Sequence, residues 1–251
     1  MLVSILIITA LAALPLLAVT AAAYAIDRGQ RGDAGTEPLH VAGTVWAFLH
    51  EWLAGVALLA AWPFRLRGEM SPAPRVAVLV PEMHCSSASF WYLRRRLRAA
   101  GWLAVAGVHR SGDVARMREA LDARLASLPA ETELVLVGHG LGGLLVRHYA
   151  ELHPALPIRH VVTLGTPHQG SRAMPYRWLR APAPAPVPSE PRVDVIAIYS
   201  DFDAWLVPID DAYCPRGFNI AVRGVGHCAM LQSRRVADLI AENLAAPAPS
   251  R

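Results

Sequence analysis

Short apolar runs alternate with amphipathic segments along most of the chain. The runs lack a strict polar alternation, which is typical of strands that are buried on both faces of a parallel sheet. They predict strands at residues 76–80, 103–108, 134–138, 160–164, 193–198 and 218–222. Segments with apolar residues at helical spacing predict helices at 89–100, 111–128, 141–153 and 233–244. This alternation predicts an α/β fold, a mostly parallel sheet flanked by helices, with ligands at the carboxyl ends of the strands.

The N-terminal part of the chain begins with a long apolar run. Residues 2–26 contain no charged side chain, and at about 1.5 Å per residue a helix of this length crosses a bilayer. We expect residues 1–26 to form a transmembrane anchor. A cleaved signal peptide is the alternative, but the run is long for one and lacks a basic start. The sequence therefore predicts a location at the inner or cytoplasmic membrane.

A second apolar segment covers residues 39–64. From Val41 to Phe64 it contains three tryptophans and is interrupted only by His50 and Glu51. It is either a second span or an interfacial helix, and the polar pair favours a helix that lies in the interface or packs on protein. If both segments span, the nearby arginines place the main domain on the cytoplasmic side, whereas a single span leaves the side open; these arginines are Arg65, Arg67 and Arg75.

Composition limits the classes of function. A chain of 251 residues holds one α/β domain and an N-terminal addition, and a mean hydropathy of +0.31 indicates apolar residues outside the core. All 24 basic residues are arginine, and the stretch RRRLR at 94–98 is typical of a solvated helix face, so we expect no nucleic-acid partner.

The three cysteines lack metal-ligand spacing, which predicts no metal site. Cys214 and Cys228 either form a disulfide in an exported domain or remain thiols.

The stretch LVLVGHGLGGLLV at 134–146 predicts a strand, a tight corner and a helix. This is the layout of the nucleophile elbow, whose motif is G-x-S-x-G, and Gly140 stands where that motif has its serine. Glycine adopts the strained backbone of such a corner without penalty. Gly140 would therefore stabilise the fold by about 1 kcal/mol while removing the nucleophile.

Further motifs follow this corner in a fixed order. Together they resemble the α/β-hydrolase family, specifically bacterial triacylglycerol lipases and esterases, and the resemblance covers a domain at residues 75–246. The segments that carry it are GHGLGG at 138–143, LGTPHQGS at 164–171, YSDFDAWLVP at 199–208 and GVGHCAML at 224–231. Each is weak alone, but nucleophile, acid and histidine occur in the order of this fold's catalytic triad.

The resemblance implies roles for individual residues. Asp203 corresponds to the acid that orients the histidine, with Asp201 as the second candidate, and His227 corresponds to the general base. Gly140 holds the nucleophile position. No cofactor is expected.

The loop that builds the oxyanion hole also departs from the family pattern. The family has His-Gly after the first core strand, where this chain has Pro81 and Glu82. The backbone N–H groups of Met83 and Leu141 are the candidate oxyanion donors. A carboxylate at Glu82 would oppose a developing negative charge unless it is turned away or protonated.

These changes predict a membrane-anchored, lipase-like protein that binds an acyl ester or lipid-like ligand without efficient hydrolysis. One alternative is an active ester hydrolase that uses water activated by the His227 and Asp203 pair, or Cys85 as nucleophile. Another is a structural partner in a membrane complex, for which the sequence names no protein partner. The proline-rich connection at 181–191 leaves little room for a lid, so we expect a shallow groove and small esters.

Overall fold

The computed structural model describes residues 41–66, 73–170, 194–206 and 209–245, together with Leu17, Ala18 and Ala21. The rest of the anchor expected at 1–26, Arg67 and the proline-rich connection at 181–191 lie outside the described residues.

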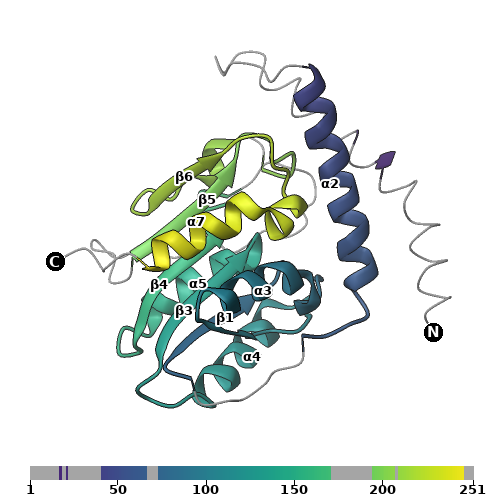
Figure 1. Ribbon diagram of the computed structural model, residues 1–251. Helices are drawn as coiled ribbons and strands as arrows, with labels where there is room; N and C mark the ends of the chain where they lie inside the picture. The colour runs from purple at the N-terminus through teal and green to yellow at the C-terminus, as the bar shows by residue number, and fades with distance from the viewer. Residues whose placement is uncertain are drawn as a thin grey trace.

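A six-stranded parallel sheet forms the centre of the described domain (Figure 1), as the apolar runs predict. Its strand order is β2-β1-β3-β4-β5-β6. The strands are β1 (Arg75–Val80), β2 (Leu103–Ala106), β3 (Glu133–His139), β4 (Ile158–Leu164), β5 (Asp194–Ser200) and β6 (Phe218–Val222). Most central positions are fully buried, because helices cover both faces of a parallel sheet.

Helices cover the sheet on two sides and define two apolar cores. One core lies under α3 (Trp91–Ala99) and α7 (Arg234–Ala245), whose buried residues include Leu93, Leu97 and Ile240. The other lies under α4 (Val114–Ala126) and α5 (Leu141–Leu152). Short 3₁₀ turns complete the connections: η1 (Ser87–Phe90), η2 (Ile209–Ala212) and η3 (Cys228–Gln232).

The apolar helix α2 (Val41–Ala61) lies along one side of this domain and contacts η1 and η3 (Figure 1). By length and composition alone it is apolar enough to cross a membrane. Its small residues Ala47 and Ala54 are buried against the domain, whereas larger apolar residues face outward, among them Trp46, which is 70% exposed, and Leu53, which is 56% exposed. The helix therefore belongs to the fold on one side and presents an apolar surface on the other.

Candidate active site

The corner between β3 and α5 has the backbone of a strained turn. Gly140 adopts φ +54° and ψ −123°, a conformation that side chains disfavour. The neighbouring Gly142 packs so closely on the end of β1 that a Cβ there would overlap the carbonyl oxygen of Pro81. The corner thus keeps a tight strand-to-helix turn at the carboxyl end of a central strand.

Asp203 and His227 meet beside this corner. His227 Nδ1 lies 2.7 Å from Asp203 Oδ2, although 24 residues separate them in the sequence. The other carboxylate oxygen of Asp203 accepts the backbone N–H groups of Trp205 and Leu206 at 2.9 and 3.2 Å. Asp203 is completely buried and held by its own loop, so its carboxylate fixes the orientation of the imidazole.

The second candidate acid, Asp201, is engaged elsewhere. Its carboxylate pairs with Arg223 and accepts the backbone N–H of Gly224. Of the two carboxylates considered from the sequence, the structure brings Asp203 to His227.

The Glu82 carboxylate lies in the corner itself. Its Oε2 accepts the N–H of Leu141 at 2.9 Å, and its Oε1 accepts the N–H of Met83 at 2.7 Å. An ideal Cβ built on Gly140 would overlap Oε2, so the carboxylate fills the space that a side chain at position 140 would enter. The two backbone N–H groups considered as oxyanion donors, those of Met83 and Leu141, therefore both donate to the Glu82 carboxylate. The Glu82 side chain points into the corner and not away from it.

His227 faces this carboxylate with its second ring nitrogen. His227 Nε2 lies 4.0 Å from Glu82 Oε2, which is too long for a hydrogen bond, and it has no hydrogen-bond partner within the described ranges. Burial disfavours the charged ring, but Asp203, Glu82 and Glu51 together outweigh it and raise the pKa of His227 to about 9. The ring is therefore a cation near neutral pH, with carboxylates around it.

A second histidine supports the first. His139 Nε2 lies 3.1 Å from the backbone carbonyl oxygen of His227, and the centroids of the two rings are 4.3 Å apart. Burial and the neighbouring His227 hold the pKa of His139 well below its usual value. His139 is thus a neutral ring that donates to the backbone of His227.

Glu51 joins α2 to the histidine loop, the segment of Cys228 and Ala229 directly after His227. Residue-type patterns alone did not reveal this connection. Its Oε1 accepts the N–H of Cys228 and its Oε2 accepts the N–H of Ala229, both at 2.9 Å. Glu51 is almost completely buried. A carboxylate within an otherwise apolar helix was the available signal, and its partners are the two backbone amides that follow His227.

The end of α2 is also attached to the loop of Glu82. Trp62 Nε1 donates to the carbonyl oxygen of His84 at 3.1 Å, and the Ser86 hydroxyl donates to the carbonyl oxygen of Phe64. The Arg110 guanidinium stacks on the Trp62 ring at 3.9 Å from its centroid. One apolar helix therefore contacts both loops that build the site.

Cys85 is a half-buried thiol in the loop of Glu82. Burial and the nearby Glu82 raise its pKa to about 12, so it stays protonated at neutral pH. A protonated thiol is a poor nucleophile, and this environment disfavours the role considered for it. All three cysteines are free, so the disulfide considered between Cys214 and Cys228 is not formed.

Within the residues that the structure describes, no group of three or more His, Cys, Asp and Glu side chains is arranged to hold a metal ion.

Comparisons with known proteins identify the fold. No family model and no curated protein matches the sequence. Solved structures do match: an alpha-beta serine hydrolase homologue from Coxiella burnetii has a TM-score of 0.53 at 14% identity, over 72% of this chain and 89% of that one. The chain has the α/β-hydrolase fold.

Two further matches with this fold are a lipolytic and an esterase structure. The structure described for LipS and LipT, two metagenome-derived lipolytic enzymes, has a TM-score of 0.51 at 14% identity, covering 69% of this chain and 92% of that one. A polyneuridine aldehyde esterase mutant has a TM-score of 0.52 at 14% identity, covering 68% and 99%. The structural neighbours of this α/β-hydrolase domain therefore include lipases and esterases.

Proposed function

We propose that this protein is a membrane-associated, lipase/esterase-like protein that binds an acyl ester or lipid-like ligand and has lost serine-type acyl transfer. Gly140 would hold the position of the nucleophile, with Asp203 and His227 as the remaining pair. The observation that carries the proposal is the Glu82 carboxylate, which fills the space beside Gly140 and bonds the N–H groups of Met83 and Leu141.

Electrostatics support loss of acyl transfer. The tetrahedral intermediate of ester cleavage needs those two N–H groups to stabilise its oxyanion. Two negative charges about 4 Å apart repel by about 4 kcal/mol at an effective dielectric constant of about 20, a rate penalty of roughly a thousandfold. Glu82 would impose this penalty in addition to the missing hydroxyl, so a serine at position 140 alone would not restore the reaction.

The surroundings of the site support a small or slender hydrophobic ligand. The side chain of His227 is 5% exposed and that of Glu82 is 14% exposed, so little polar surface is open to solvent. A site with so little exposed surface admits an apolar ligand more readily than a strongly hydrated one. Binding measured for a series of esters with increasing acyl chain length would show which ligand length the site accepts.

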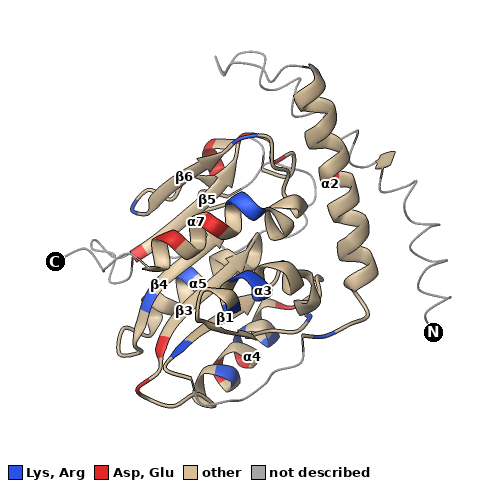
Figure 2. Ribbon diagram, in the orientation of Figure 1, with Lys and Arg blue, Asp and Glu red and all other residues tan. Residues whose placement is uncertain are grey.

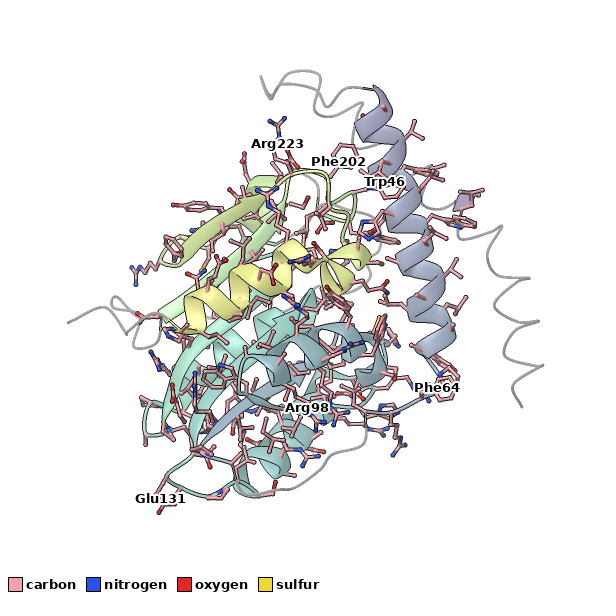
Figure 3. All side chains as sticks on the ribbon, viewed as in Figure 1. Trp46, Phe64, Arg98, Glu131, Phe202 and Arg223 are labelled. Carbon is pink, nitrogen blue, oxygen red and sulfur yellow. The ribbon has the colours of Figure 1, made fainter. Side chains whose placement is uncertain are left out.

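The outer face of α2 supports membrane association. Figure 2 shows this helix almost entirely free of charge, and Figure 3 places Trp46 and Phe64 toward its two ends. Val45, Leu49 and Leu53 lie exposed on the same helix. Tryptophan and aliphatic residues on one face suit the bilayer interface, with the inner face of the helix held on the domain by Glu51.

Slow hydrolysis by water is the second candidate function. It is favoured by the intact Asp203 and His227 hydrogen bond and by the unbonded Nε2 of His227. Against it, a ring with a pKa of about 9 is protonated at neutral pH and cannot accept a proton from water.

Labelling with a fluorophosphonate, which reacts with activated serine hydroxyls, tests the proposal. The native protein should remain unlabelled, whereas the double variant Gly140→Ser/Glu82→Gly should be labelled, because it supplies the hydroxyl and frees both N–H groups. Adding His227→Ala to the double variant should abolish the labelling. Labelling of the native protein, or ester turnover that His227→Ala removes, would overturn the proposal.

A further inference from the structure

The C-terminal end of α2 carries exposed aromatic and arginine side chains together. Trp62 is 47% exposed and Phe64 is 43% exposed, and Figure 3 places Phe64 at this end of the helix. Arg65 follows directly and is exposed. Arg110 comes from the loop between β2 and α4; its guanidinium lies 3.9 Å from the centroid of the Trp62 ring and donates to the Trp62 carbonyl oxygen at 3.3 Å. Two cations and two aromatic rings thus share one surface, which we call the α2 collar (Trp62, Phe64, Arg65 and Arg110).

Hydrogen bonds hold the two arginines of the α2 collar on adjacent segments. The N–H of Leu66, the residue after Arg65, donates to the Ser87 hydroxyl oxygen at 3.2 Å. The same oxygen lies 3.1 Å from Nδ1 of His109, the residue before Arg110. Burial and then the positive charges of Arg65 and Arg110 lower the pKa of His109, so both guanidinium groups act on one ring. The two charges are therefore held close together although 45 positions separate them in the sequence.

The loop beside the α2 collar is fixed by hydrogen bonds to two other segments. Among the residues that the structure describes, His84 is the only non-glycine with a positive φ, at 66°. Its N–H donates to the carbonyl oxygen of Ser111 at 2.8 Å, and its carbonyl oxygen accepts the indole N–H of Trp62 at 3.1 Å. Such a backbone persists only where its surroundings hold it in place. The Trp62 ring and the Arg110 guanidinium that stacks on it are therefore attached to a fixed part of the domain.

The positive charge of the α2 collar is not neutralised by a carboxylate of the described residues. Within this part of the chain no Asp or Glu side chain forms an ion pair with Arg65 or Arg110. The acid closest to Arg110 in the sequence is Asp113, which caps α4 by accepting the N–H groups of Ala115 and Arg116 at 2.7 and 3.2 Å. A guanidinium binds phosphate oxygens through two parallel hydrogen bonds, so a pair of exposed arginines suits a phosphate from outside the protein.

We propose that the α2 collar binds the headgroup phosphate of an anionic phospholipid while the outer face of α2 lies against the acyl chains. The inference rests on the membrane association in the proposed function, and it adds the class of lipid and the end of the helix that lies at the headgroups. α2 ends at Ala61, directly before the α2 collar, and exposes Leu49 and Leu53 on its outer face. In a bilayer, indole rings lie at the headgroup level and arginines attract anionic lipids. A nucleic acid would gain the phosphate contacts but would leave the apolar face in water, so the surface favours lipid.

Native mass spectrometry of the full chain in a neutral detergent tests this assignment. Phosphatidylglycerol and phosphatidylcholine with identical acyl chains are added in turn, and the lipid that the protein retains is measured. The native protein should bind phosphatidylglycerol about thirtyfold more tightly, the ratio expected when each of two arginines contributes about 1 kcal/mol. The double variant Arg65→Gln/Arg110→Gln should lose most of this preference. Arg65→Lys/Arg110→Lys keeps both charges and should retain more of the preference than the glutamine variant.

A matched control separates a specific site from the overall charge of the protein. Arg118→Gln/Arg216→Gln removes two other exposed arginines, on α4 and in the loop before β6, and should leave the lipid preference unchanged. Urea denaturation of each variant checks that it is folded. Equal binding of the two lipids by the native protein, equal losses in the two glutamine variants, or displacement of the lipid by a DNA duplex would overturn the inference and leave membrane association standing. Retention of neither lipid would instead overturn the membrane association on which the inference rests.

Discussion

The Oε2 atom of Glu82 accepts the backbone N–H of Leu141 at 2.9 Å, and Leu141 is the residue directly after Gly140. This amide is the first of α5, where no earlier turn of the helix supplies an acceptor. The carboxylate therefore satisfies a helix terminus and fills the space beside a glycine in one contact. Glu82 and Gly140 therefore form a single structural unit at this corner.

Replacement of Gly140 by alanine should destabilise the protein more than replacement of Gly101. Both glycines have positive φ, with an expected strain of about 1–3 kcal/mol each, but only at Gly140 would the new Cβ also overlap a carboxylate. Gly101 has open space at that position and is the matched control. Urea denaturation of both variants, and of Gly140→Ala in a Glu82→Ala background, measures the difference. The contact between position 140 and the Glu82 carboxylate would be contradicted if Gly140→Ala and Gly101→Ala lowered the free energy of unfolding equally and Glu82→Ala did not reduce the loss at position 140.

Stability should fall as the pH rises from about 6.5 to about 9. The folded pKa of His227 is raised to about 9 from 6.5, so its stabilising contribution is complete below pH 6.5 and is lost as pH passes through the folded value. The loss should be on the order of 3 kcal/mol at most. Denaturation of the native protein and of His227→Gln across this range provides the measurement. If the free energy of unfolding fell with pH at the same rate in both proteins, His227 would be excluded as the source of the pH dependence.

Removal of the Glu51 carboxylate should loosen the histidine loop. Glu51→Gln keeps one oxygen acceptor, so one of the amides of Cys228 and Ala229 loses its partner, at an expected cost of about 1–3 kcal/mol. Glu242→Gln, an exposed residue of α7, is the control and should be neutral. Hydrogen exchange of the two amides, measured with the free energy of unfolding, should change only in Glu51→Gln. Unchanged exchange at both amides would show that α2 does not hold this loop.

The outward face of α2 should contact lipid in the full chain. An environment-sensitive fluorophore on Leu53→Cys should shift to shorter wavelength when phospholipid vesicles are added, because Leu53 is exposed on the apolar face. The same label on Glu131→Cys reports from the end of the domain marked in Figure 3, far from α2, and should not shift. Equal responses at the two positions would exclude α2 as a specific lipid contact.

The order of strands and helices could be predicted because strands that are buried on both faces of a parallel sheet have uninterrupted apolar sequences. The run at 218–222 coincides with β6, and the helix expected at 141–153 ends one residue earlier, at Leu152. At 89–100 the segment divides into the turn η1 and the helix α3, a distinction that periodicity does not resolve. The pairing of Asp203 with His227 was implied by the resemblance of the motifs to the α/β-hydrolase family, with Asp201 as the alternative acid, and the two side chains lie in contact.

Two features could not be predicted, each for a physical reason. The side chain of Glu82 could have turned to solvent, and its position depends on two amides that the sequence places 58 residues apart, Met83 and Leu141. The orientation of α2 was ambiguous because both of its faces are apolar. The small side chains of Ala47 and Ala54 allow close packing on the buried side, and the larger Trp46 and Leu53 lie outside. A helix oriented by hydrophobicity alone would bury its larger apolar residues instead.

The central claim is that the Glu82 carboxylate occupies the donors beside Gly140, and hydrogen exchange at the Leu141 amide tests it most directly. The account predicts a protected Leu141 amide in the native protein and exchange about tenfold faster in Glu82→Ala, since loss of one such hydrogen bond costs about 1.4 kcal/mol. The Val146 amide, within α5, should exchange equally in both proteins. Equal Leu141 exchange rates in native protein and Glu82→Ala would contradict the account.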